Sequence, residues 1–220
     1  MKLEISSLLD LSKTIAAGLF DGMTYPWQAL DKIEAFILAL GPTLPESEYK
    51  RMGENVWAAL DAEIFASAYI KGPCIIDHGA QVRHCAFVRG GAVVGKNAVV
   101  GNSVELKNVV LFDGVQTPHY NYVGDSILGF KAHMGAGSIT SNVKSDKLPV
   151  VVKDGDGRIE TGRKKFGAIL GDNVEIGCNS VLNPGTVIGR GSRVYPVSSV
   201  RGCVAENSIY KSAGEIVEIK

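Results

Sequence analysis

A six-residue period is the feature that most constrains the fold of this chain. From residue 64 onward, large and mostly aliphatic side chains recur at every sixth position: Ile64, Ile70, Ile76, Val82, Val88, Val94, Val100, Leu106, Phe112 and Pro118. The same period returns at Leu170, Ile176, Leu182, Ile188, Val194 and Val200. Small or short side chains stand four residues after most of these positions. The repeat predicts a mainly β fold, a parallel β-helix of hexapeptides in which three short strands and three corners close one coil of about 18 residues.

The composition fits such a fold and excludes several classes of function. Glycine accounts for 26 of 220 residues and aromatic residues for 7%, which suits a backbone with frequent corners and small side chains. Lys+Arg and Asp+Glu both number 23, whereas proteins that coat nucleic acid or anionic membranes carry an excess of positive charge. No apolar run approaches the roughly 20 residues of a membrane span. We therefore expect neither a nucleic-acid nor a membrane partner.

The N-terminus and the cysteines favour a cytoplasmic protein. The first residues, MKLEISSLLDLSK, contain acids and no signal-peptide core, so secretion is not expected. Cys74, Cys85, Cys178 and Cys203 form no CxxC pair, and we expect reduced and mostly buried thiols.

The chain divides into two predicted parts, a helical N-terminal region over residues 1–63 and a β-helix domain over residues 64–220. Pro26 can open a helix at its first position, and Gly41-Pro42 can end it. Between them, apolar side chains recur at helical spacing on one face: Trp27, Leu30, Ile33, Phe36, Ile37 and Leu40. We expect this region to cover one end of the coil or a neighbouring chain.

The hexapeptide phase breaks between Pro118 and Val123, and a long insert follows at about residues 141–167. The insert contains two β-prone runs around Asp154-Gly155-Asp156-Gly157, which predicts a hairpin. Long loops that leave a rigid scaffold often carry binding groups.

Residues 18 apart are expected to lie above one another in successive coils, and two of the resulting columns carry basic side chains. One column contains Lys71, Arg89 and Lys107, and the next contains Arg83, Gly101 and His119. Stacked cations repel one another, so the column is either a solvated ridge or a binding site for an anion such as phosphate. His119 stands at the phase break beside the cations and is a candidate general base.

Three motifs between residues 102 and 142 resemble a known family. The segment NSVELKNVVLFDGVQTPHYNYVGDSILGFKAHMGAGSITSN contains E-x-K-N, H-x-N-Y-x-G-D and G-A-G-x-I-x-x-N. It resembles the C-terminal acetyltransferase domain of the bifunctional UDP-N-acetylglucosamine pyrophosphorylase/glucosamine-1-phosphate acetyltransferases. Residues 161–189, TGRKKFGAILGDNVEIGCNSVLNPGTVIG, are similar to the archaeal sugar-1-phosphate nucleotidylyltransferase/acetyltransferases. The resemblance covers about residues 64–205.

This resemblance implies a left-handed β-helix, a homotrimer with its active site between subunits, and acetyl-CoA as co-substrate without a metal. The implied activity is acetyl transfer to an amino-sugar 1-phosphate such as glucosamine 1-phosphate, with His119 as the catalytic base. The residues implied to bind the sugar phosphate are Arg89, Lys107, Tyr122 and Asn142, with Lys144 and Lys147 as further phosphate contacts. Ala136, through its backbone amide, and Cys178 are assigned to the coenzyme.

The sequence departs from the family pattern at four places. His133 stands where the family has an asparagine, and Val143 where the bacterial enzymes have a tyrosine. The C-terminal arginine of the bacterial enzymes has no clear match. Residues 1–60 are too few for the family's nucleotidyltransferase domain and contain no GxGTRL-type loop.

Two other classes of function stay open at this stage. Zinc carbonic anhydrases also use trimeric hexapeptide coils, but zinc needs three converging ligands. Of the four histidines, His78 and His84 are expected on different faces, and His119 and His133 are not closely spaced. The other class is a non-catalytic protein that binds or senses sugar phosphates, which the substitutions at positions 133 and 143 favour.

Overall fold

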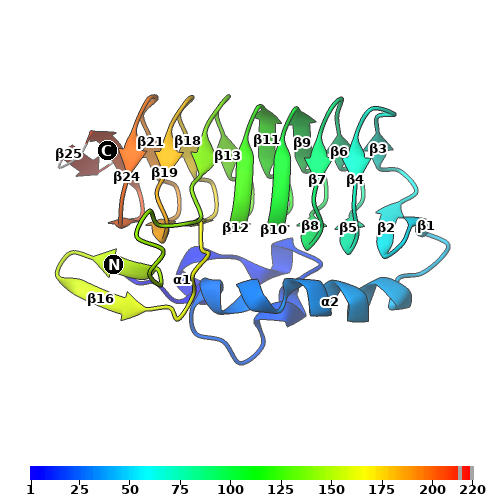
Figure 1. Ribbon diagram of the computed structural model, residues 1–220, viewed down its shortest axis with the longest axis horizontal. Coiled ribbons are helices and arrows are strands. Elements are labelled where there is room, and N and C mark those ends of the chain that lie inside the picture. The colour runs from blue at the N-terminus through cyan, green and yellow to red at the C-terminus, as the bar shows by residue number, and fades with distance from the viewer. Residues whose placement is uncertain (213–214, 219–220) are drawn as a thin grey trace.

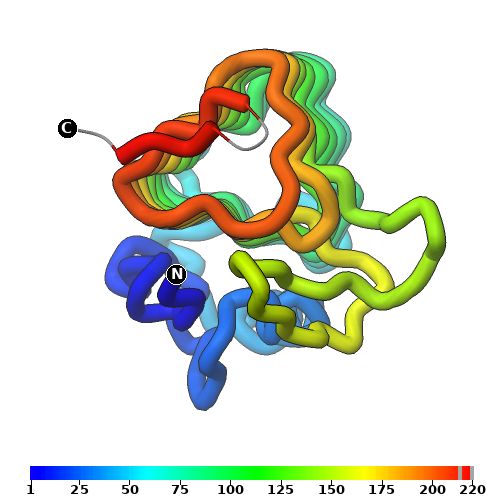
Figure 2. Tube along the Cα trace, turned by 90° about the vertical axis from the view of Figure 1, so that its left-hand side faces the viewer, coloured from blue at the N-terminus to red at the C-terminus, as the bar shows by residue number. Residues whose placement is uncertain are grey.

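The predicted parallel β-helix is confirmed by the computed structural model, which describes residues 1–212 and 215–218. Its coils stack along one axis with their strands in parallel register (Figure 1). Viewed along that axis, the coils superpose into one closed outline, with the N-terminal segment and a hairpin against one side (Figure 2).

Strand pairing divides the coil into three faces. Face 1 contains β3 (Glu63–Ile64), β6 (Gln81–Val82), β9 (Val99–Asn102), β11 (Gln116–His119), β13 (His133–Met134), β18 (Glu175–Ile176), β21 (Arg193–Val194) and β24 (Ser208–Ser212), with β25 (Glu215–Glu218) antiparallel at its end. Face 2 contains β4 (Tyr69–Ile70), β7 (Phe87–Val88), the first halves of β10 (Glu105–Leu111) and β12 (Tyr122–Leu128), β14 (Ile139–Thr140), β19 (Val181–Leu182) and β22 (Ser199–Val200). Face 3 contains β2 (Val56–Ala59), β5 (Cys74–Ile76), β8 (Ala92–Val94), the second halves of β10 and β12, β17 (Ala168–Leu170), β20 (Thr186–Ile188) and β23 (Cys203–Val204).

The coil begins earlier than the repeat counting predicts. β2 already pairs with β5 in parallel, so the first coil starts at Val56 rather than at residue 64. β1 (Tyr49–Gly53) pairs with β2 antiparallel and covers its outer edge.

Coil length varies along the stack, and this variation corrects the predicted phase. β5 pairs with β8 at an interval of 18 residues, whereas β8 pairs with β10, and β10 with β12, at an interval of 17. The shortening lies at the corner between faces 2 and 3. Gly90 and Gly91 form this corner in one coil, and Asn108 and then Asp125 replace the glycine pair in the next two, each with a positive φ. The register therefore changes at Asn108 and again at Asp125, and the single break predicted at residues 118–123 is wrong.

The shorter coils also change which side chains point inward. Leu111 and Thr117, both fully buried, pair with the inward residues of β8 and β9 and take the places predicted for Phe112 and Pro118. Phe112 is fully buried too, but outside the coil, where its ring packs edge-on against Phe20 with centroids 6.0 Å apart. A shift of one residue in a strand exchanges its two faces, which explains the change.

The other predicted inward positions form the core. Those that are fully buried include Ile76, Val82, Val88, Val94, Val100, Leu106, Leu170, Leu182, Ile188 and Val200. The small side chains at the corners are buried as well, among them Cys74, Ala80, Ala92 and Ala98. Close packing at these corners leaves no room for larger groups.

The N-terminal segment lies along the side of the coil and covers face 3, not an end of the coil (Figures 1 and 2). It consists of α1 (Ile5–Leu8), the 3₁₀ helices η1 (Leu11–Lys13), η2 (Ala17–Phe20), η3 (Pro26–Asp31) and η4 (Gly41–Thr43), and α2 (Ile33–Leu40). Its apolar stripe is buried as predicted at Trp27, Leu30, Ile33 and Ile37, and α2 packs on β8 and β10. None of the helices in residues 1–212 and 215–218 has the length and apolar character of a membrane span.

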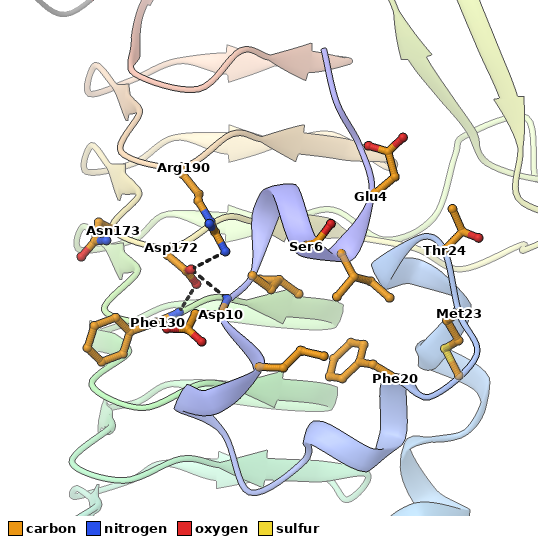
Figure 3. Close-up of a pocket in the computed structure, with 13 residues that line it drawn as sticks. Glu4, Ser6, Asp10, Phe20, Met23, Thr24, Phe130, Asp172, Asn173 and Arg190 are labelled. Atoms are coloured by element: carbon orange, nitrogen blue, oxygen red, sulfur yellow. Dashed lines mark hydrogen bonds and ion pairs between the residues drawn. The ribbon is translucent and has the colours of Figure 1, made fainter.

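Asp172 links the N-terminal segment to the coil by hydrogen bonds. Its carboxylate is nearly buried and accepts hydrogen bonds from the backbone amides of Asp10 (2.9 Å) and Phe130 (2.8 Å), and it pairs with Arg190 at 3.1 Å (Figure 3). These residues border a cleft of about 870 Å³. Burial raises the pKa of Asp172, while the two amides and the guanidinium oppose that change.

The insert folds back onto face 3 beside the N-terminal segment (Figure 2). The predicted hairpin is confirmed: β15 (Val151–Asp154) and β16 (Gly157–Glu160) pair antiparallel around Gly155-Asp156. Val150 and Val152 are fully buried, and β15 contacts β20 and β23.

Candidate functional site

Polar side chains converge on the Asp125 carboxylate at the corner between faces 2 and 3. Lys107 Nζ lies 3.0 and 3.1 Å from its two oxygens. Asn108 Nδ2 donates to it at 3.0 Å, and Asn142 Nδ2 at 2.5 Å. Only 3% of the Asp125 side chain is exposed, so these donors compensate most of the cost of burying the charge. We call Lys107, Asn108, Asp125 and Asn142 the Asp125 cluster.

Local backbone geometry places the Asp125 cluster. Asn108 and Asp125 adopt φ angles of 55° and 47°, which their short polar side chains tolerate better than most residues. Between the strand and this corner, Gly124 leaves the space that the cluster uses. A Cβ at Gly124 would lie 2.5 Å from the Tyr122 hydroxyl and 2.9 Å from Asn142 Nδ2.

Tyr122 and Arg89 extend the cluster along face 2. Asn142 Nδ2 donates to the Tyr122 hydroxyl at 3.3 Å, and Tyr122 lies opposite Glu105 in register. Arg89, one coil away, donates to Glu105 at 2.7 Å. Burial, followed by the carboxylates of Asp125 and Glu105, raises the pKa of Tyr122, so its phenol stays protonated and able to donate near neutral pH.

The stacking of Lys71, Arg89 and Lys107 is as the sequence predicts, because the residues directly before them, Ile70, Val88 and Leu106, pair in register from coil to coil. Two of the three cations are already paired with carboxylates, Arg89 with Glu105 and Lys107 with Asp125. Reasoning from the sequence missed both acids. Asp125 is the last residue of the H-x-N-Y-x-G-D motif, and that position could have signalled it.

A second group of predicted site residues stacks at the corner between faces 1 and 2. Backbone hydrogen bonds link the coils there: the carbonyl of His119 accepts from Gly137 N at 3.0 Å, and that of Ala136 from Asn179 N at 2.8 Å. His119, Ala136 and Cys178 are therefore successive members of one column, about 4.8 Å apart per coil. We call these three residues the His119 column.

The 17-residue coil also changes the neighbour of His119. His119 pairs with Asn102, not with Gly101 as the column count predicts. Asn121, nearly buried, holds the turn after His119: its amide nitrogen donates to the carbonyls of Gly135 (2.8 Å) and Ser138 (3.1 Å). Its oxygen accepts from the backbone amide of His119 at 3.2 Å. Asn121 is thus a positioning residue that the sequence reasoning did not identify.

Three residues discussed from the sequence lie apart from both groups. Lys147 is exposed in the insert, where its backbone amide donates to Lys144, and Lys144 pairs with Asp146. His133 lies on face 1 and pairs with Glu175 at 3.0 Å. In the described part of the chain, no hydrogen bond or ion pair joins the side chain of Lys144 or Lys147 to Lys107 or Asn142.

The cysteines differ in exposure from the prediction that most are buried. Cys178 and Cys85 are exposed, Cys203 is partly buried and Cys74 is buried, and all are free thiols. Burial raises the pKa of Cys74 to about 12. The exposed thiol of Cys178 leaves its corner of the His119 column accessible to a ligand.

The described residues contain no group of three or more His, Cys, Asp or Glu side chains arranged to hold a metal ion. His78 instead pairs with Asp61 at 3.0 Å and with Glu48 at 3.4 Å, and His84 contacts Ser67 at 2.9 Å.

Residues 70–189 match the protein family described as the GMPPB C-terminal domain. Among curated proteins, the chain is 38% identical to the bifunctional sugar-1-phosphate nucleotidylyltransferase/acetyltransferase of Sulfurisphaera tokodaii over 109 residues, which are 50% of this chain and 27% of that protein. It is 36% identical to the bifunctional protein GlmU of Methanococcus aeolicus over 119 residues, 54% of this chain and 29% of that protein. The matched part thus spans under a third of the length of these relatives.

Solved structures with a similar shape include an N-acyltransferase, AntD from Bacillus cereus, in complex with dTDP and coenzyme A. It is 18% identical, with a TM-score of 0.36 and coverage of 76% of this chain and 80% of that chain. The acetyltransferase domain of PglB from Neisseria gonorrhoeae is 15% identical, with a TM-score of 0.37 and coverage of 85% and 78%.

Proposed function

The chain belongs to the GMPPB C-terminal domain family, and on this premise we propose that it is an acetyltransferase that uses acetyl-CoA and acts on an amino-sugar 1-phosphate. The observation that carries the proposal is the pair of residue groups at the two ends of face 2. The Asp125 cluster with Arg89 and Tyr122 offers cations and a phenol to an anion, and the His119 column offers a base beside an exposed corner. The relatives whose names include acetyl transfer support the same activity.

The acceptor phosphate suits the end of face 2 that carries Lys107. The Lys107 ammonium has three N–H groups and uses two of them on Asp125, so one is left for an anion. Arg89 and the protonated Tyr122 phenol add donors from neighbouring strands. A phosphate held there fixes where the amine of the sugar can reach, which is how remote binding groups accelerate a reaction.

The chemical step needs a base and a group that stabilises the developing oxyanion. The sugar amine attacks the thioester carbonyl carbon while the His119 imidazole takes its proton. The backbone amide of Ala136 stabilises the negative oxygen of the tetrahedral intermediate. The carbon–sulfur bond then breaks, and the leaving thiolate takes the proton from the imidazolium. The products are the N-acetyl sugar and the free thiol of coenzyme A.

We also propose a homotrimer in which a neighbouring chain completes the site. Face 3 is covered by the N-terminal segment and the hairpin, which leaves faces 1 and 2 for contact. Face 2 and its corner carry exposed aromatic side chains, with Tyr69 63%, Phe87 40% and Tyr120 65% exposed. Such a patch beside the His119 column is typical of a protein interface. Sedimentation at micromolar concentration tests this proposal, and a monomer would contradict it.

Release of free thiol from acetyl-CoA tests the proposed activity. The protein is mixed with acetyl-CoA and glucosamine 1-phosphate, and thiol is followed with a chromogenic disulfide. Thiol release that depends on both substrates supports acetyl transfer, and glucosamine without phosphate is the matched control. If the sugar phosphate binds but no thiol appears, the non-catalytic sugar-phosphate-binding alternative is the better description.

A further inference from the structure

The N-terminal end of the coil, at the right of Figure 1, leaves two strand edges free in the described part of the chain. Within residues 1–212 and 215–218, β3 pairs only with β6, and β4 pairs only with β7. The inward side chains Ile64 and Ile70 are partly exposed there, whereas Val82 and Val88, one coil further on, are fully buried. A hollow of about 760 Å³, lined by Ile64, Ile70 and the turn between β1 and β2, lies at this end.

The apolar character of this end calls for a cover. In proteins built from stacked repeats, a terminal repeat with a polar outer face is needed for solubility, because the repeat has a neighbour on one side only. Here the first coil and its hairpin instead carry exposed apolar side chains, with Met52 47% and Leu60 54% exposed. The other end of the coil differs, because Val200 and Val204 are buried and β25 folds back on β24. Two N-terminal ends therefore match each other better than one N-terminal end matches a C-terminal end.

The charges around the open end suit a second copy of the same chain. Glu63 lies on face 1 and Lys71 follows β4 on face 2, and both side chains are exposed. Neither forms an ion pair with a side chain in the described ranges. A two-fold axis perpendicular to the coil, through the corner between faces 1 and 2, exchanges β3 with β4. It therefore brings Glu63 of each copy to the side where Lys71 of the other copy lies, an arrangement of opposite charges that favours association.

We propose that the N-terminal end of the coil binds the same end of a second copy in a closed two-fold contact. Such a contact uses the same surface twice and is complete with two units, so it covers the free edges of both without forming a fibre. The contact is independent of acetyl transfer and of the proposed trimer, because the end of the coil is separate from the outer sides of faces 1 and 2. It doubles whatever unit those faces form, giving six chains from trimers or two chains from monomers.

The mass of the particle in solution tests the proposal. Sedimentation equilibrium of the whole protein at micromolar concentration should give six chains, or two if faces 1 and 2 form no trimer. The double variant Met52→Glu/Ala66→Glu places two acids on the open end, where the two-fold axis brings them close to the same acids of the second copy. Its particle mass should be half that of the wild type, with Kd for the end contact raised about 100-fold or more. Its melting temperature at a concentration where both proteins are dissociated should not change, because both side chains are exposed.

Matched variants make the result specific. Leu38→Glu/Ile216→Glu adds the same two charges at exposed apolar positions away from the open end, and its mass should equal that of the wild type. Glu63→Lys and Lys71→Glu each place like charges opposite one another and should weaken the contact about tenfold or more. The double variant Glu63→Lys/Lys71→Glu should restore it.

Three results would overturn the proposal. The first is a wild-type particle of three chains or one, which would leave the open end to a different polypeptide. The second is an equal effect of the acidic pairs at positions 52 and 66 and at positions 38 and 216. The third is a charge-exchanged double variant that associates no better than its two single variants. A doubled particle that releases no thiol from acetyl-CoA would support the end contact and refute acetyl transfer.

Discussion

Replacing Asp125 by asparagine tests whether its buried carboxylate holds the corner between faces 2 and 3. The substitution keeps the shape of the side chain, and asparagine tolerates the φ of 47° at this position. It turns one acceptor oxygen into an NH₂ group, although Lys107, Asn108 and Asn142 all donate to this side chain. At least one of these N–H donors then faces the new NH₂ group, which cannot accept a hydrogen bond.

The expected loss of stability follows from the burial of the pair. Removing one partner of a buried ion pair costs about 3–5 kcal/mol, and a hydrogen bond to a charged group contributes about 1.5–3 kcal/mol. The Lys107 side chain is 28% exposed and can recover part of its hydration, so the lower range applies. We expect Asp125→Asn to lower the free energy of unfolding by about 2–3 kcal/mol, and the melting temperature by roughly 4–12 °C for a chain of this size.

Urea unfolding, followed by circular dichroism at one fixed protein concentration, measures this change. Glu105→Gln is the control, because it removes the partner of Arg89 from an exposed pair that solvent screens, and its effect should be much smaller. If Asp125→Asn unfolds at the same urea concentration as the wild type or the control, the carboxylate does not hold the corner. The slope of the unfolding free energy against urea concentration must be the same in the variants and the wild type, so that a shifted midpoint reports a change in stability alone.

Four further predictions address the His119 column, the contact between the coil and the N-terminal segment, and the cysteines. His119→Ala should lower kcat/KM for acetyl transfer by about 10²–10⁴-fold. Its melting temperature should not change, because the His119 side chain is exposed. Wild-type activity in this variant would exclude a role of His119 as the base. Phe112→Ala should lower the free energy of unfolding, measured with urea, by about 3–5 kcal/mol, because Phe112 fills the contact between the coil and the N-terminal segment. A loss below about 1 kcal/mol would contradict that packing. Iodoacetamide should label Cys85 and Cys178 before Cys74, whose pKa burial raises to about 12. Acetyl-CoA should slow labelling at Cys178 and not at Cys85, as read by peptide mass spectrometry; equal protection of both thiols would place the coenzyme elsewhere.

The candidate site could be predicted in part from the sequence. Because coils stack in parallel register, residues a coil apart become neighbours, and counting correctly brought Arg89 beside Lys107. The carboxylates that neutralise them were missed, although one further step of 18 from Lys107 reaches Asp125. In the structure Gly124 is the residue in register with Lys107, and the side chain of Asp125, the next residue, forms the ion pair. The contribution of Asn121 likewise depends on a turn that no period describes.

The six-residue period by itself determined the β-helix. An aliphatic residue at each step, such as Val82 or Val88, has one favourable place, inside the coil, and repetition leaves no other fold that buries them all. The tertiary structure decided the register after residue 106. There Leu111 and Phe112 are both apolar, so the pattern alone cannot say which one points inward. The tight corner at Asn108 selects Leu111, and Phe112 then turns outward. That outward position is favourable only because the N-terminal segment covers it with Phe20, a contact between residues 92 positions apart in the chain.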